Sequence, residues 1–277
     1  MERARGLGFE PMFGSELEFH LYRESYAEAH EKHHRGLTPP VPYILDFRYA
    51  DAVTMADNHA VYKNGAKEIA ALNGCSITFM AKPYHDAIGS SCHIHSSLWR
   101  DGKSLFAGES EIFRQFLAGQ IACASELAIF LAPTINSYER YAAGSWAPTT
   151  LACGHDNRTC GFRIVCHGQG LRADPRIPGA DANPYLAFAA LLAAGLYGIE
   201  QGLELPPAFE GNAYVSDEKR FPSSLRDAIG ALERGPVARA ASGDLVVDHF
   251  LNYARTEQEI FDKVVTCWER ERLFERG

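Results

Sequence analysis

The sequence lacks several features that would assign it to a membrane, secreted or repeat class of protein. No apolar run approaches the roughly 20 residues needed to cross a bilayer, and the N-terminus, Met-Glu-Arg-Ala-Arg-Gly, lacks the apolar core of a signal peptide. There is no internal repeat and no low-complexity segment. We therefore expect a cytoplasmic protein that has no membrane partner.

Cysteine pairs and an excess of positive charge are also missing. The seven cysteines form no Cys-x-x-Cys pair and are odd in number, so we expect reduced thiols and no zinc site built on cysteine. The formal net charge is −8, from 27 basic and 35 acidic residues. This balance argues against a nucleic-acid partner that binds through counterion release.

Length and composition are those of an ordinary globular protein with a substantial core: 277 residues, 46% hydrophobic and 22% charged. Apolar periodicity, capping residues and prolines predict helices over 51–72, from Ser110 to before Pro133, from Pro184 to Gly202, and in the tail after Ser223. Strands are predicted over 14–21, 75–83, 91–98, 162–165 and 171–177, with exposed polar segments over 24–36 and 136–148.

Three of these strands carry ionisable or polar side chains on one face. Successive side chains of a strand point to opposite faces, so every second residue shares a face. The three sets are His93, His95 and Ser97; Glu16, Glu18 and His20; and Arg172, Asp174 and Arg176. Carboxylates with imidazoles suit a divalent metal ion, and arginines suit phosphate or carboxylate groups. The pattern predicts a metal and phosphate site on the concave face of a sheet.

Structural interpretations of the same residues stay open at this point. Two histidines on one strand can be satisfied interior residues, Glu18 and His95 can pair with each other, and a buried Arg163 can serve an ion pair. Three histidines between Glu24 and Gly36 could bind a metal, but a solvated cluster of charges is the simpler interpretation.

Six short motifs follow one another along the chain. They are Ser15-Glu16-Leu17-Glu18, Cys92-His93-Ile94-His95-Ser96-Ser97-Leu98, Asn136-Ser137-Tyr138-Glu139-Arg140, Asp156-Asn157-Arg158, Arg176-Ile177-Pro178 and Ala182-Asn183-Pro184-Tyr185-Leu186-Ala187. Each is weak alone, but in this order they resemble the catalytic domain of the glutamine synthetase family over nearly the whole chain. The resemblance implies one catalytic domain over 1–277 with an α+β fold, in which helices pack outside a curved, largely antiparallel sheet.

The resemblance also implies an ATP-dependent ligase. In that family ATP phosphorylates the γ-carboxylate of glutamate, and an amine then displaces phosphate from the acyl phosphate. Two or more Mg²⁺ or Mn²⁺ ions per site would bridge phosphate oxygens and offset the developing charge. The implied partners are glutamate, a small amine, and further copies of the chain in a dodecamer of two stacked six-membered rings.

The resemblance also implies a role for single residues within these motifs and near them. The implied metal ligands are Glu16, Glu18, His93 and Asp174. The implied phosphate and nucleotide contacts are His95, Ser97, Arg158, Arg163, Arg172 and Tyr49. The implied contacts to glutamate are the arginine clamps Arg140 and Arg176 and the loop at Gly89. Among all of these, the expected catalytic residues are Arg140, Arg158 and Arg176.

Two parts of the family pattern have no counterpart in the sequence. Two glutamates of the second metal site, with several dozen neighbouring residues, should precede the segment that starts at Phe47, but Asp46 and Phe47 follow Leu45 directly. We expect further residues between Asp46 and Phe47 in the intact protein, because a true deletion would leave Glu18 without partner ligands. The family's small N-terminal β-grasp domain, which completes each site from the neighbouring subunit, is also without a counterpart.

Two substitutions bear on the acceptor and the metal. Trp146 stands in the substrate loop where ammonia-using members have a glutamate. An indole cannot accept a proton, although its face attracts an ammonium group. Asp174 is one methylene shorter than the family's glutamate. These features resemble the branch that joins glutamate to polyamines or ethanolamine-type compounds. The alternatives are a glutamine synthetase that uses ammonia and a catalytically silent structural or regulatory member, which the missing glutamates would favour.

Overall fold

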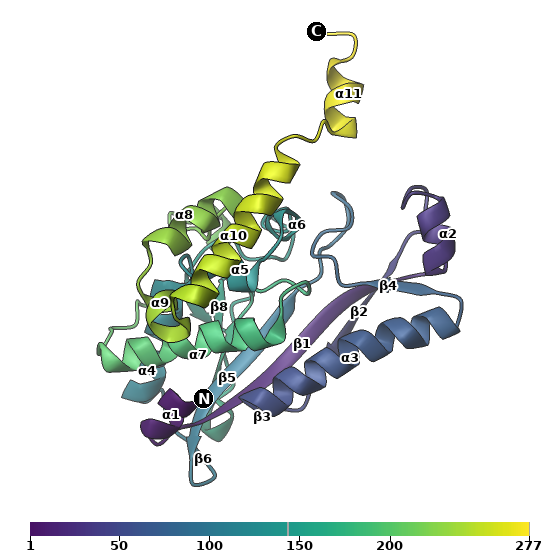
Figure 1. Cartoon of the computed structure of the whole chain (residues 1–277). Coiled ribbons are helices and arrows are strands. Elements are labelled where there is room, and N and C mark those ends of the chain that lie inside the picture. The colour runs from purple at the N-terminus through teal and green to yellow at the C-terminus, as the bar shows by residue number, and fades with distance from the viewer. Residues whose placement is uncertain (143, 277) are drawn as a thin grey trace.

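The computed structural model describes residues 1–142 and 144–276, and its centre is one open mixed sheet (Figure 1). The main path of the sheet has the order β2-β1-β5-β9-β8-β7, while β3 and β4 also pair with β1, and β6 pairs with β5. The strands are β1 (Glu10–Tyr22), β2 (Val41–Asp46), β3 (Ala50–Asp51), β4 (Ser76–Thr78), β5 (Cys92–Arg100), β6 (Lys103–Ser104), β7 (Cys153–His155), β8 (Phe162–Val165) and β9 (Arg172–Pro175).

Strand pairing is antiparallel throughout the described sheet except between β7 and β8, which are parallel. The longest strand, β1, has 13 residues and is flanked by β2 and β5. This arrangement confirms the predicted α+β class with a largely antiparallel sheet.

The helices gather in two groups (Figure 1). The long helix α3 lies beside β1, while α4, α7, α8, α9 and α10 pack together around the other half of the sheet, and α11 projects away from the body. The helices are α1 (Glu2–Gly6), α2 (Tyr26–Glu31), α3 (Ala52–Leu72), α4 (Glu111–Cys123), α5 (Ala128–Leu131), α6 (Ile135–Tyr138), α7 (Pro184–Glu200), α8 (Leu225–Arg234), α9 (Val237–Ser242), α10 (Asp244–Phe261) and α11 (Cys267–Leu273). None of the described helices combines the length and apolar character that a membrane crossing requires.

Side-chain caps explain where three long helices begin. The side chains of Asp51, Ser110 and Asn183 accept hydrogen bonds from backbone N–H groups in the first turns of α3, α4 and α7. These groups have no partner inside the helix, so a capping oxygen stabilises each start. Pro184 occupies the first turn of α7, where its missing N–H costs nothing. All three predicted starts are confirmed.

Three predicted segments differ from the structure. The strand expected over 75–83 is only Ser76–Thr78, because the chain turns as the Thr78 hydroxyl accepts the Met80 N–H at 3.1 Å. The helix after Ser110 ends at Cys123 and resumes only as the short α5. The polar segment 136–148 begins inside one helical turn, α6, because Thr134 and Ser137 form a capping box.

The crossing of α4 and α7 fixes the wall behind the site. A Cβ on Gly119 would lie 2.1 Å from the Ala194 carbonyl oxygen, so only glycine allows the helices to approach this closely. From α4, the Gln120 amide donates to the Ser96 hydroxyl on β5 at 3.3 Å. As predicted, α7 is a largely buried central helix.

Candidate active site

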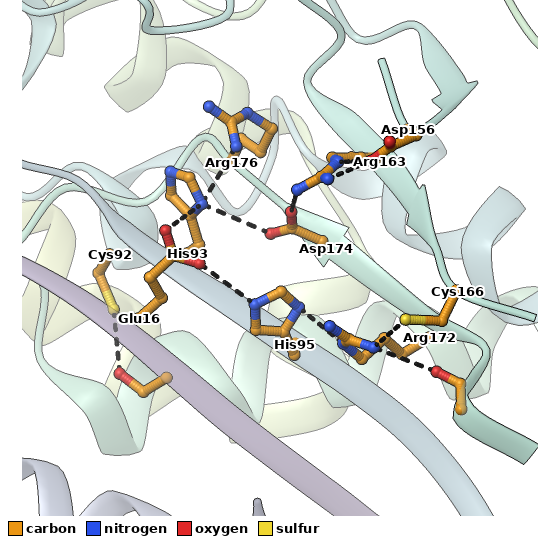
Figure 2. A network of polar contacts seen from close by, with 12 residues as sticks. Glu16, Cys92, His93, His95, Asp156, Arg163, Cys166, Arg172, Asp174 and Arg176 are labelled. Carbon is orange, nitrogen blue, oxygen red and sulfur yellow. Dashed lines mark hydrogen bonds and ion pairs between the residues drawn. The ribbon is translucent and has the colours of Figure 1, made fainter. Parts of the chain in front are cut away.

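Neighbouring strands bring the ionisable residues of the sequence pattern onto one face of the sheet. Glu16 on β1 lies opposite His93 on β5, and Arg163 on β8 lies opposite Asp174 on β9. Residues opposite each other on paired strands share a face of the sheet. Figure 2 shows the Glu16, His93, His95 and Asp174 side chains converging from three strands.

A group of possible metal ligands forms at this point. One ligand atom each from Glu16, Glu18 and His93 lies within 4.8 Å of the other two. His93 Nδ1 is 3.4 Å from Glu16 Oε1 and 4.0 Å from Asp174 Oδ1. Carboxylate oxygens with one imidazole form a donor set that suits Mg²⁺ or Mn²⁺. Three of the four predicted metal ligands, Glu16, Glu18 and His93, lie close together, and Asp174 borders them next to His93.

The charge state of these groups also suits a cation. The His95 imidazole, whose Nε2 is 3.6 Å from Glu16 Oε2, lowers the pKa of Glu16 to about 2, helped by His93 and Arg176 and opposed by burial. Burial lowers the pKa of His93, which favours the neutral imidazole that binds metals. Asp174 is fully buried, and neither of its carboxylate oxygens has a hydrogen-bond donor among the described residues. A buried carboxylate without donors is costly, and a bound cation would remove that cost.

Arginines border the metal-ligand group on its β8–β9 side. Arg163 Nη1 lies 3.7 Å from Asp174 Oδ2, and the same guanidinium donates from Nε to Asp156 Oδ1 at 2.8 Å. Arg172 donates from Nε to His95 Nδ1 at 3.2 Å, which orients the imidazole toward Glu16 (Figure 2). Arg163 therefore does serve ion pairs, and it does so next to a cavity that could hold phosphates.

That cavity has a volume of about 650 Å³ and opens beside the metal-ligand group. The Tyr49 and Trp99 rings stack at one side of it, with centroids 5.9 Å apart and planes 24° apart. Such a pair offers an aromatic face to a flat base. The predicted nucleotide contacts that line the cavity are Tyr49, His95, Ser97, Arg163 and Arg172.

Trp99 was not predicted as a residue of the nucleotide cavity, although the alternation of β5 indicates it. The alternation that places His93, His95 and Ser97 on one face of β5 also places Trp99 there. The Trp99 indole N–H donates to the Ser97 hydroxyl at 2.9 Å. Phe47 and Arg48, which also line the cavity, lie in the loop between β2 and β3, where no alternation pattern marks them.

The predicted glutamate clamps are two nearly buried arginines. Arg176 is 5% exposed, and its Nη1 is 3.2 Å from His93 Nδ1. Arg140 is 2% exposed and donates to the Ile177 carbonyl. The Nε atoms of both are buried without an acceptor among the described residues, so each retains capacity to bind an anion. A Cβ on Gly89 would lie 2.7 Å from Arg140 Cγ, so this glycine makes room for the Arg140 side chain.

Two predicted residues lie apart from this group. Arg158 lines a different cavity, of about 520 Å³, together with His155, Asp156 and Glu210. Trp146 is 66% exposed at a backbone φ of 64°. Their predicted roles in catalysis and substrate binding stay predictions.

Glu18 has its own partner. Its Oε2 accepts the Ser91 backbone N–H at 2.6 Å, while His95 contacts Glu16 and Arg172. The alternative in which Glu18 and His95 pair with each other is therefore not what the structure shows.

The junction at Asp46–Phe47 is continuous in the fold. Asp46 ends β2 opposite Glu16, and the Phe47 N–H donates to the Ser15 carbonyl at 2.9 Å. The expected additional residues at this junction stay a prediction.

Comparison with known proteins places this arrangement in a family. Residues 31–273 match the family model described as glutamine synthetase, catalytic domain. The chain is 45% identical to the γ-glutamylethanolamide synthetase GlnA4 of Streptomyces coelicolor, over all of this chain and 70% of that protein. It is 41% identical to a glutamate–isopropylamine ligase of a Pseudomonas species, over 86% of this chain and 54% of that protein.

The first of these alignments has 322 positions for the 277 residues of this chain, so at least 45 positions are without a counterpart here. A solved GmaS structure in complex with ADP superposes with a TM-score of 0.88 at 30% identity, over 99% of this chain and 75% of that one. The chain belongs to the glutamine synthetase family, of which it carries the catalytic domain.

Proposed function

We propose that the protein is an ATP-dependent ligase that joins the γ-carboxylate of glutamate to an amine through a γ-glutamyl phosphate. The observation that carries the proposal is the buried Asp174 carboxylate, which lacks hydrogen-bond donors and lies between His93 and Arg163 beside the 650 Å³ cavity. Two similar proteins, whose names give ethanolamine and isopropylamine as acceptors, support an acceptor other than ammonia.

In this proposal each group of residues has a separate task. Glu16, Glu18, His93 and Asp174 would hold Mg²⁺ or Mn²⁺, which supplies charge neutralisation at the phosphate oxygens when bound. The phosphates of ATP would be held by His95, Arg158, Arg163 and Arg172, and the nucleotide by Tyr49 and Ser97. Fixed cations at the transferring phosphoryl group stabilise the charge that develops there.

The substrate groups would be oriented by the remaining residues. Arg140 and Arg176 would clamp the glutamate carboxylates with their unused Nε donors, and the loop at Gly89 would receive the amino end. Burial of both guanidinium groups excludes water from these contacts, which strengthens them. Trp146 would contact the amine.

The proposal extends to the whole protein. Residues 1–277 would form one catalytic domain, and the intact chain would have further residues between Asp46 and Phe47. The assembly would be a cytoplasmic dodecamer of two stacked hexameric rings, which light scattering of the full-length protein would test.

The test of the function is phosphate release together with mass spectrometry of the product, with glutamate, ATP and a panel of amines. We expect a γ-glutamylamide, no product without the amine, and loss of activity on adding EDTA. Glutamine formed from ammonium as fast as any γ-glutamylamide would favour the second candidate, glutamine synthetase, which similarity to a relative of that name supports. No product with any acceptor would favour a silent family member.

A further inference from the structure

The two proposed glutamate clamps come from segments that are far apart in the chain. Arg140 follows α6, and Arg176 follows β9. Arg176 is held at the sheet, because its backbone N–H donates to the Gly161 carbonyl at 2.9 Å. Arg140 instead reaches across to the loop that follows Arg176, where its guanidinium donates to the Ile177 carbonyl. The distance between the two guanidinium groups therefore depends on how this loop is joined to α6.

The loop over residues 177–182, here called the clamp loop, contacts the segment around α6 at both of its ends. At one end, the Ile177 carbonyl also accepts the Tyr141 hydroxyl at 2.8 Å. At the other end, Asp181 Oδ2 accepts the Ser137 hydroxyl at 2.6 Å and the Thr134 hydroxyl at 3.0 Å. Thr134 and Ser137 are the two residues of the capping box of α6. Asp181 thus joins the clamp loop to the helical turn that precedes Arg140.

We infer that Asp181 is a positioning residue for glutamate: its carboxylate fixes α6 against the clamp loop and thereby sets the spacing of the Arg140 and Arg176 guanidinium groups. Glutamate binding is itself part of the proposed function, on which this inference rests. Asp181 lines neither the cavity beside the metal-ligand group nor the cavity at Arg158. It would therefore act through Arg140 and not by touching a substrate.

Burial makes the contact between Asp181 and α6 a strict one. Ser137 is fully buried, and Asp181 Oδ1 is a buried atom that has no hydrogen-bond partner among the described residues. Burying a carboxylate costs free energy, which two hydroxyl donors offset only in part. The contact gives direction in return, because both hydroxyls must lie where a single oxygen can accept them. Such a contact suits a role in geometry better than a role in stability.

Gly179 holds the Asp181 carboxylate from the side of the clamp loop. A Cβ on Gly179 would lie 2.2 Å from Asp181 Oδ1, so the carboxylate packs directly against the loop backbone. The Gly179 N–H donates to the Leu131 carbonyl at the end of α5 at 3.0 Å, which fixes that backbone in turn. The Asp181 carboxylate therefore lies between a fixed glycine and the hydroxyls of α6, with little freedom to move.

Lys63 of α3 fixes the backbone on both sides of Asp181. Its ammonium group donates to the Ala180 carbonyl at 2.5 Å and lies 3.4 Å from the Ala182 carbonyl oxygen. The Ala180 N–H donates to the Ser90 carbonyl at 3.1 Å, in the segment next to the glutamate loop at Gly89. Because the backbone is held in this way, the side chain of Asp181 is what links it to α6.

The experiment compares two substitutions of Asp181 in the whole protein. Asp181→Asn keeps an oxygen that can accept both hydroxyls, while Asp181→Ala removes it. We expect Asp181→Ala to raise KM for glutamate at least about tenfold and Asp181→Asn by less than about threefold, with KM for ATP and Mn²⁺ binding unchanged in both. A residue that serves stability alone would instead lower the folded fraction, and with it the apparent kcat, while KM stayed the same.

Two further variants change the same contact without replacing Asp181, and they carry the test if Asp181→Ala fails to fold. Ser137→Ala removes one of the two donors and should raise KM for glutamate about threefold. Gly179→Ala displaces the carboxylate and should act as Asp181→Ala does. The matched control is Glu269→Ala on α11, which projects away from the body (Figure 1), because Glu269 Oε2 also accepts a capping-box hydroxyl, that of Thr266 at 2.8 Å. It should change neither KM.

An unchanged KM for glutamate in Asp181→Ala, or an equal rise in the KM values for glutamate and ATP, would overturn the inference. Glutamate binding in the presence of Mn²⁺ and ADP, measured by titration calorimetry, separates it from the proposed function. If wild-type protein binds glutamate but turns over no amine, the proposed function fails. The role of Asp181 then still stands if Kd for glutamate rises in Asp181→Ala and not in Asp181→Asn, and it fails if Kd is the same in all three proteins.

Discussion

The two ends of the candidate site differ in how their residues are held. At the metal and phosphate end, Glu16, His93 and Asp174 project from paired strands, so the register of the sheet fixes their separation. At the substrate end, Gly89 and Trp146, the expected contacts to glutamate and to the amine, belong to irregular segments. A sheet tolerates little displacement, whereas loops accept substitutions and insertions. The comparison indicates that the phosphoryl chemistry is built into the scaffold and that the choice of amine can change around it.

The largest effect should come from removing a ligand at the rigid end. We expect Glu16→Ala to lower kcat at least about 1,000-fold, because the lost carboxylate would hold the ion that neutralises the phosphates. Mn²⁺ binding, followed by electron paramagnetic resonance, should weaken in parallel while circular dichroism stays unchanged. Glu10→Ala, an exposed carboxylate on the same strand, is the matched control and should behave as wild type. Full activity of Glu16→Ala would remove the basis for the metal assignment.

A second prediction concerns the support behind the rigid end. His59 of α3 is 1% exposed, its Nδ1 is 2.8 Å from the Ser15 hydroxyl, and burial lowers its pKa from 6.5 to about 4. The unfolded chain therefore takes up a proton below pH 6.5 that the folded protein resists until about pH 4. The free energy of unfolding should be fully retained above pH 6.5 and fall by up to about 3 kcal/mol as the pH drops through 4.

Urea unfolding at pH 7.5 and pH 4.5 measures this loss. Replacing the imidazole in His59→Gln should reduce the pH dependence of stability by up to one proton over this range. An unchanged slope in the variant would mean that other groups cause the acid sensitivity.

At the substrate end, Gly89→Ala tests the Arg140 clamp. The new methyl group would lie 2.6 Å from the Ala81 carbonyl oxygen and 2.7 Å from Arg140 Cγ, so the guanidinium must move. We expect KM for glutamate to rise at least about tenfold with Mn²⁺ binding unchanged, because the interaction lost is with the substrate. Gly65→Ala on α3, where a Cβ meets nothing within 4 Å, should instead stabilise the fold by about 0.5–1 kcal/mol. An unaltered KM in Gly89→Ala would argue against Arg140 as a glutamate contact.

The contrast between strands and loops also explains what the sequence could predict. The alternation of side chains along a strand is a local property of the sequence. It therefore predicted that Glu16 and Glu18 share one face of their strand, and that His93 and His95 share one face of theirs. Caps at Ser110 and Asn183 located two helix starts for the same reason. The motifs indicated the expected role of each site residue. The register in which the strands pair, and so the distances between these residues, came from the structure.

Contacts between distant segments could not be predicted in this way. The stacking of Tyr49 on Trp99 depends on the loop after β2, and the hydrogen bond between Ser15 and His59 depends on how α3 packs against β1. The separate cavity at Arg158 likewise follows from the position of the segment around Glu210. Each of these joins residues that lie tens of positions apart, where periodicity carries no information.

The smallest effect, and the one that tests the adaptable end most directly, should come from Trp146. Its side chain is 66% exposed, so an amine bound against it would bury apolar surface on both partners. Amines of the proposed kind have pKa values near 10.4 and arrive as cations, which the face of an indole also attracts. Because ammonium has no carbon surface to bury, we expect wild-type protein to prefer a diamine or ethanolamine to ammonium by at least about tenfold in kcat/KM, or about 1.4 kcal/mol. Trp146→Glu should narrow or invert this preference, Trp146→Phe should keep most of it, and Trp268→Glu, at an exposed tryptophan of α11, should leave it unchanged. A preference that is the same in Trp146→Glu as in wild type would show that Trp146 does not select the amine.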